Sequence, residues 1–222
     1  ADGYTLLMVG TTTLITNPLL VKKLPYKVAD FTPVALVGMV PFLAVAHPSV
    51  PANDLKELVA YAKANPGKIS YSTSGQGTSS HLVAAMFESA TGTKLMDVPY
   101  KGSSPALLAV LSGEVSMTFD GVTLYIPHIQ AGKLKPIALM GDRRLAAIDK
   151  VPTMVENGYR DAVAVAVFGL VAPTGTPRSV VTRFNDAVRK AMSEPEVAAR
   201  LRELDAYVEP RSPEGFAQLI AQ

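Results

Sequence analysis

The chain has 222 residues, of which 48% are hydrophobic and 18% are charged, and its formal net charge is +2. This is the composition of a globular protein that is long enough for one large domain or for two smaller lobes. The near balance of charges disfavours a polyanionic partner such as nucleic acid. Because cysteine is absent, the sequence excludes disulfides, thiolate catalysis and cysteine-ligated metal sites.

The longest apolar run, Val34–Ala46, is interrupted by Gly38 and Pro41. A membrane-spanning helix needs about 20 residues, so we expect this shorter run to be buried in the protein core. The chain opens with residues 1–3 and continues directly into a strand-like segment at 4–9, with no export signal ahead of it. This start is typical of a position in the middle of a domain.

Short apolar segments predict the strands, and capping residues predict where helices begin. The strands are expected at residues 4–9, 69–73, 95–98, 115–119 and 135–140. Helical patterns separate them, which indicates βαβ units and mostly parallel sheets. Four residue pairs mark helix starts: Asp54 with Glu57, Thr176 with Pro177, Ser193 with Glu196, and Ser212 with Pro213.

Two extended runs, Val34–Ala46 and Ala162–Ala172, are unusually apolar and bracket a segment about the size of one lobe. They predict two strands that cross between lobes and frame an inserted second lobe. Clefts between lobes are common sites for small ligands. A single doubly wound domain is the alternative interpretation.

The most informative stretch joins a predicted strand to a predicted helix. It consists of small and polar residues: Ser74, Gly75, Gln76, Gly77, Thr78 and Ser79. The first N–H groups of a helix lack partners within the helix, and the helix dipole favours negative charge there. Glycines allow close approach of a ligand, and hydroxyls can donate to it. We therefore expect this loop to bind a carboxylate, although a plain capped turn is the structural alternative.

Three further junctions carry polar side chains. Ser104 and Pro105 are read as a cap and a first helical residue, with Lys101 and Ser103 at the rim of a site. Asp120 ends a strand and is expected either to bind an amino or hydroxyl group of a ligand or to cap the next helix. Hydroxyls at Thr11 and Thr12 follow the first strand, at the edge where open α/β sheets bind ligands.

Catalytic patterns are weak in this sequence. The three histidines are His47, His81 and His128, and the first and last adjoin prolines at element boundaries. No G-x-S-x-G elbow or H-E-x-x-H metal pattern occurs, so we predict no metal and no cofactor. An enzyme would have to rely on His81 and Asp120.

Motifs in order along the chain resemble those of the Bug/TctC solute receptors of tripartite tricarboxylate transporters. The resemblance runs from Ala1 almost to Gln222. The matching motifs are Asp2-Gly3-Tyr4-Thr5-Leu6-Leu7, Asn17-Pro18-Leu19, Leu24-Pro25-Tyr26, Asp30-Phe31-Thr32-Pro33-Val34, the loop 74–81, Val98-Pro99-Tyr100-Lys101-Gly102, Pro127-His128-Ile129, Ala131-Gly132-Lys133-Leu134, Val151-Pro152-Thr153 and Gly169-Leu170-Val171-Ala172-Pro173.

The resemblance implies a two-lobed periplasmic binding-protein-like α/β fold of type II. Residues 1–40 and 166–222 would form the first lobe, and 41–165 the inserted second lobe. Members of the family hold one carboxylate between two loops, one from each lobe. Residues 74–79 match the second-lobe loop. The partner loop, together with the family's leading strand and export signal, is expected ahead of Ala1 and is missing from this sequence.

The same resemblance implies a periplasmic receptor that captures a small carboxylate and presents it to a membrane permease. Dicarboxylates, tricarboxylates, acidic amino acids and aromatic acids all suit such a site. Asp120 matches a ligand-contacting Asp of the family, with His81 and Lys101 as supporting residues. We expect a monomer without nucleic-acid partners. The alternatives are an enzyme on the same scaffold and the effector-binding lobe of a transcription regulator.

Overall fold

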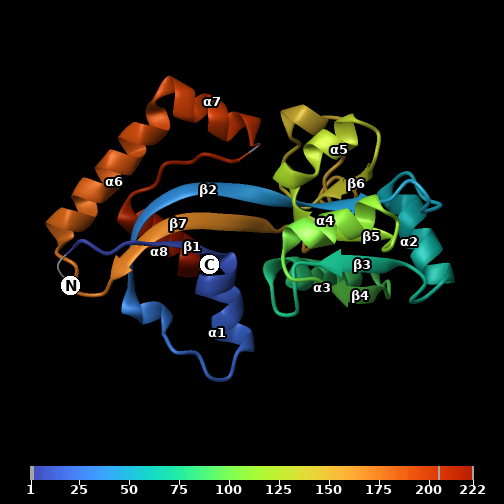
Figure 1. Ribbon diagram of the computed structural model, residues 1–222, viewed down its shortest axis with the longest axis horizontal. Coiled ribbons are helices and arrows are strands. Elements are labelled where there is room, and N and C mark those ends of the chain that lie inside the picture. Colours follow the sequence, from blue (N-terminus) through green and yellow to red (C-terminus); the bar gives the residue numbers. More distant parts are fainter. Residues whose placement is uncertain (1–2, 205, 222) are drawn as a thin grey trace. The chain divides into compact units, whose positions relative to one another are not determined.

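The computed structural model describes residues 3–204 and 206–221 (Figure 1). Ala1, and Asp2, which begins the first motif of the resemblance, therefore lie outside the described residues. The chain divides into two compact units, one made of Ala1–Val40 with Ala166–Gln222 and the other of Pro41–Val165. The apolar runs expected to be strands form β2 (Phe31–Ala46) and β7 (Val165–Pro173), and each has residues in both units.

In the first unit, β7 lies between β1 and β2 in the sheet. Strand β1 pairs antiparallel with β7, and Leu7 lies opposite Val171. Glycine at position 169 leaves room for the fully buried ring of Phe216, because a side chain there would collide with that ring. The elements of this unit outside β2 and β7 are β1 (Leu7–Gly10), the π-helix η1 (Thr12–Thr16), α1 (Asn17–Leu20), η2 (Val28–Asp30), α6 (Arg178–Ser193), α7 (Pro195–Glu203) and α8 (Pro213–Ala221).

Helix α6 covers this sheet with an apolar face. Val181 on the helix packs in one cluster with Val34 of β2 and Ala172 of β7. The buried amide of Asn185 fixes the helix in place, since its Nδ2 donates to the Val34 carbonyl at 2.8 Å and to the Arg211 carbonyl at 3.0 Å. The apolar residues that α6 turns to this cluster, Val181, Phe184 and Val188, recur at helical spacing, as amphipathic periodicity predicts.

In the second unit, β3 lies between β5 and β4 and pairs parallel with both. Strand β2 pairs antiparallel with β5 and with β6. The expectation of mostly parallel sheets is therefore correct for β3 with β4 and β5, and wrong for β2 with β5, β2 with β6 and β1 with β7. The remaining elements of this unit are α2 (Leu55–Ala64), β3 (Ser70–Thr73), α3 (Ser79–Thr91), β4 (Met96–Pro99), α4 (Ser103–Leu111), β5 (Met117–Gly121), η3 (Val122–Leu124), α5 (Ile126–Gln130), β6 (Lys135–Leu139) and η4 (Ala146–Ile148).

An aromatic cluster holds α3 against the parallel strands. Phe87 of α3 and Phe119 of β5 have ring centroids 4.9 Å apart, and Tyr71 of β3 meets Phe119 edge-on at 5.6 Å. All three side chains are buried. This packing fixes the start of α3 relative to the carboxyl ends of the strands, where the glycine loop lies.

The capping predictions have mixed outcomes. Asp54 caps α2 by accepting the Glu57 N–H at 2.8 Å, and the Ser212 hydroxyl accepts the Gly215 N–H at 3.1 Å before α8, so both are confirmed. Pro177 is the N-cap of α6 rather than its first residue. Ser193 is wrong as a cap, because it ends α6 and its hydroxyl donates to the Lys190 carbonyl.

No helix within residues 3–204 and 206–221 combines the length and the apolarity that spanning a membrane requires.

Candidate ligand-binding site

The second unit brings three strand–helix junctions together. Strands β3, β4 and β5 are neighbours and parallel, so their carboxyl ends lie along one edge of the sheet. The Tyr100 N–H donates to the Thr73 carbonyl at 2.9 Å, and the Gly102 N–H donates to the Ser74 carbonyl at 3.1 Å. Such an edge is where ligands bind in open α/β sheets.

Hydroxyl groups shape the glycine loop from inside. The Ser74 hydroxyl lies 2.8 Å from the Ser80 hydroxyl and donates to Thr78 Oγ1 at 3.1 Å. The Ser74 N–H donates to Ser80 Oγ at 2.9 Å, and the Thr78 hydroxyl donates to the Gly75 carbonyl at 2.7 Å. The predicted hydroxyl donors Ser74 and Thr78 are therefore bonded within the loop, which leaves backbone N–H groups as its main donors.

The start of α3 is left without a side-chain cap. Its N-cap residue, Thr78, makes no capping hydrogen bond, and the first turn, which begins with Ser79, contains no acidic residue. The dipole of this helix therefore favours an external anion at its first turn. Gln76 and Gly77 form the tip of the loop, and Gly77 has a φ of 74°, a left-handed conformation that suits glycine.

Close packing constrains Gly75. A Cβ there would lie 3.3 Å from the Tyr100 carbonyl oxygen, and the φ of Gly75 is 132°. Glycine is therefore required at this point for the loop to lie against the β4–α4 junction. Lys101, the predicted rim residue, is exposed in that junction.

The prediction for the β4–α4 junction is corrected. Gly102, with a φ of 112°, is the N-cap of α4, and Ser103 is its first residue. Ser104 is therefore not the cap, and Pro105 is not the first helical residue. The reason is that the left-handed glycine ends the loop early.

Asp120 is 9% exposed at the end of β5. Burial raises the pKa of its carboxyl, while the Gly121 N–H and the neighbouring hydroxyls of Ser103 and Tyr125 act in the opposite direction. The Gly121 N–H donates to Asp120 Oδ1 at 2.8 Å, so this carboxylate oxygen is already bonded to the next residue in the chain.

The other carboxylate oxygen of Asp120, Oδ2, is buried without a hydrogen bond. Asp120 Oδ2 and the Tyr125 hydroxyl oxygen are both buried without a hydrogen-bond partner of adequate geometry. Burial and the nearby Asp120 charge raise the pKa of Tyr125, which keeps its hydroxyl protonated. A buried acceptor without a partner is costly, so a ligand N–H or O–H at Oδ2 would be stabilising.

His81 connects the glycine loop to β4. Its Nδ1 accepts the Gly77 N–H at 3.3 Å, and its Nε2 lies 3.8 Å from Asp97 Oδ2. His81 therefore holds the loop, and its supporting role at a ligand stays a prediction. Ser80, Asp97 and Tyr125 were not identified from the sequence. A Ser at the start of a helix, or a Tyr between two helical segments, gives no signal of its role. An Asp within an apolar strand does give such a signal.

Thr11 and Thr12 belong to the first unit, away from the three junctions along the chain. The Thr11 hydroxyl accepts the Val167 N–H at 2.8 Å, so it holds β7. Thr12 is the first residue of η1. The ligand-binding role expected for these two residues stays a prediction.

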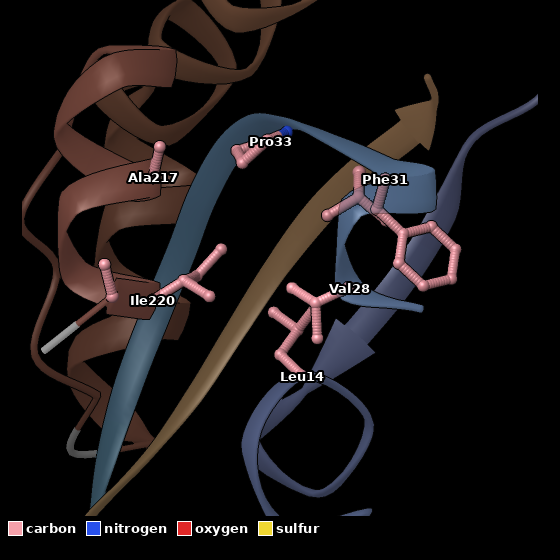
Figure 2. Close-up of a pocket in the computed structure, with 8 residues that line it drawn as sticks. Leu14, Val28, Phe31, Pro33, Ala217 and Ile220 are labelled. Carbon is pink, nitrogen blue, oxygen red and sulfur yellow. The ribbon is translucent and has the colours of Figure 1, made fainter. Parts of the chain in front are cut away.

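The first unit also contains an apolar hollow of about 300 Å³ (Figure 2). Leu14, Val28 and Ile220 point into it from three different elements. Its lining contains no charged side chain, so the hollow offers nothing to balance the charge of a carboxylate. In the described parts of the chain, no three His, Asp or Glu side chains cluster as a metal site would require.

Comparison with known proteins places this geometry in a family. The family model described as the tripartite tricarboxylate transporter family receptor matches residues 1–222. The chain belongs to this receptor family. BugT of Bordetella pertussis is 34% identical over 194 residues, which are 86% of this chain and 60% of BugT. The chain spans 60% to 66% of the length of three curated relatives that it matches.

Solved structures agree with the assignment. MatC from Rhodopseudomonas palustris with bound malate is 32% identical and superimposes with a TM-score of 0.89, over 99% of this chain and 76% of MatC. The R. palustris protein Rpa4515 with adipate is 31% identical with a TM-score of 0.91, over 99% of this chain and 74% of that protein. The fold is that of the periplasmic solute-binding receptors, and these receptors are not enzymes.

Proposed function

We propose that this chain is the ligand-binding part of a periplasmic receptor that captures a small carboxylate. The observation that carries the proposal is the position of Asp120. A buried carboxylate oxygen without a partner lies at the same sheet edge as the uncapped N-terminus of α3. Together they offer one place for an anion and one place for a hydrogen-bond donor.

The glycine loop would bind the carboxylate. Backbone N–H groups in the first turn of α3 would donate to its oxygens, and the helix dipole would favour its charge. The hydroxyls of Ser74 and Thr78 would keep the loop in shape, because they are bonded inside it. Gly75, Gln76 and Gly77 would allow the ligand to approach the backbone.

Asp120 would select what else the ligand carries. Its Oδ2 is an acceptor, so it would favour a ligand with a hydroxyl or amino group near the carboxylate. Malate and aspartate have such a group, and succinate is the same chain without it. The malate bound to the related MatC supports this ligand class.

Capture without chemistry is the proposed mechanism. The two units would act as lobes that open and close about β2 and β7, with ligand favouring the closed state through its extra contacts there. A membrane permease would then accept the ligand from the closed receptor. Thr11 and Thr12 would contribute from the first lobe, and we propose that the receptor works as a monomer.

Isothermal titration calorimetry with malate, aspartate, succinate, citrate and adipate tests the proposal. We expect at least one of these acids to bind, and malate or aspartate to bind more tightly than succinate. Asp120→Asn should remove that preference while leaving succinate binding within about twofold, because it removes the charge but not the loop. Asp142→Asn, an exposed carboxylate in the same unit, is the matched control. Failure of all five acids to bind would contradict the proposal.

A further inference from the structure

The two ring nitrogens of His81 meet different partners. Nδ1 accepts the Gly77 N–H at 3.3 Å, and Nε2 lies 3.8 Å from Asp97 Oδ2. Asp97 Oδ1 accepts the Thr73 hydroxyl at 3.3 Å, which fixes the carboxylate beside the ring. The side chain of His81 is 37% exposed, so it exchanges protons with solvent.

The hydrogen bond from the Gly77 N–H identifies the tautomer of the His81 ring. An imidazole nitrogen accepts a hydrogen bond only when it carries no proton, so Nδ1 is bare and the proton lies on Nε2, facing Asp97. In this neutral state, the ring occupies the Gly77 N–H. A second proton on Nδ1 would remove the acceptor, release that N–H and place a positive charge in the first turn of α3.

The charged group that lies against the ring is acidic. Asp97 on β4 is the charged group that lies against it. Behind Asp97, Tyr71 on β3 lies close enough to Asp97 and to Glu88 of α3 that both charges, after burial, raise its pKa. Tyr71 therefore stays neutral, and Asp97 and Glu88, the two charges that act on it, are both negative. A ligand carboxylate at the loop would add a third.

We propose that His81 couples carboxylate capture to the uptake of a proton. The proposal rests on the function proposed above, because it takes the loop 74–81 as the carboxylate site. Neutral His81 withholds the Gly77 N–H from the ligand, and protonated His81 releases it and attracts the anion. The bound receptor therefore holds more protons than the free receptor. His81 is a positioning residue, since it acts through Gly77.

Calorimetry with malate at pH 6.0 and pH 8.0 measures this coupling directly, and buffers of different ionisation enthalpy count the protons taken up. Malate carboxyls are largely ionised throughout this range. We expect the affinity at pH 6.0 to be about fivefold higher than at pH 8.0, with net proton uptake near pH 7, since a coupling of one pKa unit corresponds to about tenfold in affinity.

His81→Gln is the decisive variant. The Gln side-chain oxygen can accept the Gly77 N–H at every pH, so the variant imitates the neutral ring. Its affinity at pH 8.0 should stay within about twofold of the unsubstituted protein, and it should show neither the gain at pH 6.0 nor the proton uptake. A purely structural role would instead change the affinity equally at both pH values.

The other titratable candidates serve as controls. His47→Gln and His128→Gln should keep the full pH response. Asp120, whose pKa burial raises, would maintain a response in His81→Gln if it were the source, and that result would overturn the proposal. Malate binding that does not depend on pH would overturn the proton coupling and leave the proposed function standing. Absence of binding by malate and the other four acids at both pH values would overturn the proposed function as well.

Discussion

The main-chain N–H of Ser74 donates to the side-chain oxygen of Ser80 at 2.9 Å, which ties the end of β3 to the first turn of α3. The Ser80 hydroxyl also lies 2.8 Å from the Ser74 hydroxyl and 3.0 Å from that of Thr78. Ser80 is only 2% exposed. One buried hydroxyl therefore holds the loop in the form that we propose binds a carboxylate.

Removal of that hydroxyl should affect stability and binding together. Ser80→Ala leaves the Ser74 N–H without its acceptor, which should cost about 1–3 kcal/mol of unfolding free energy and weaken malate binding about tenfold. Chemical denaturation and calorimetry measure the two effects. Ser112→Ala, which removes a hydroxyl bonded to the Ala109 carbonyl, should lower stability without changing affinity. Equal affinity losses in both variants would contradict the role of Ser80.

Gly75→Ala tests the close approach of the loop to the β4–α4 junction. The new Cβ would lie 3.3 Å from the Tyr100 carbonyl oxygen, at a φ of 132°, so we expect a loss of about 1–3 kcal/mol and at least tenfold weaker binding. Gly132→Ala is the control, because its φ is also positive but nothing lies within 4 Å of the added Cβ. It should cost about 1 kcal/mol and leave binding unchanged. Unaltered malate affinity in Gly75→Ala would exclude the loop as the site.

Asp120 should make the free protein less stable as the pH rises. Burial raises the pKa of its carboxyl in the folded state, so folding favours the protonated form. The stability that this group contributes is therefore present at low pH and is lost as pH rises from the ordinary Asp range through the raised pKa. Without ligand, Asp120→Asn should have a higher Tm than the unsubstituted protein at pH 7, and the difference should shrink toward pH 4. A Tm difference that does not change with pH would show that the charge of Asp120 does not destabilise the folded protein.

Gly169→Ala tests how α8 packs on the first unit. A side chain at this position meets the ring of Phe216 and the Ala35 carbonyl, so the helix must shift. We expect a destabilisation of about 2–4 kcal/mol. Gly38→Ala, where the added Cβ makes only an ordinary contact at 3.7 Å, should cost under about 1 kcal/mol. Thermal unfolding followed by circular dichroism measures both, and similar losses would contradict the packing.

Much of the fold follows from patterns that are local in the sequence. The apolar run Val34–Ala46 predicts a long buried strand because β-branched and apolar residues continue without helical spacing, and β2 is that strand. The Asp54 and Ser212 caps are confirmed for the same reason, since a cap depends on residues within one turn. Strand direction was predicted less well. The antiparallel pairing of β2 with β5 depends on the path of the chain, which an apolar pattern does not encode.

The sequence predicts the loop of the candidate site but not the hydrogen bonds within it. Consecutive glycine and hydroxyl residues at 74–79 indicated a strand–helix junction with an exposed helix start, and the structure has one there. The partner of each hydroxyl depends on three-dimensional packing. Ser80 lies in the first turn of α3 and Tyr125 lies between η3 and α5. Neither position has a distinctive sequence pattern, so only the structure identifies the hydroxyl network and the buried oxygen of Asp120.

A crystal structure of the protein with bound malate is the most direct test of the carboxylate site at the start of α3. One malate carboxylate should lie within hydrogen-bond distance of backbone N–H groups in the first turn of α3, and the malate hydroxyl should lie on Asp120 Oδ2. Malate bound elsewhere, with the loop 74–81 and Asp120 untouched, would contradict it.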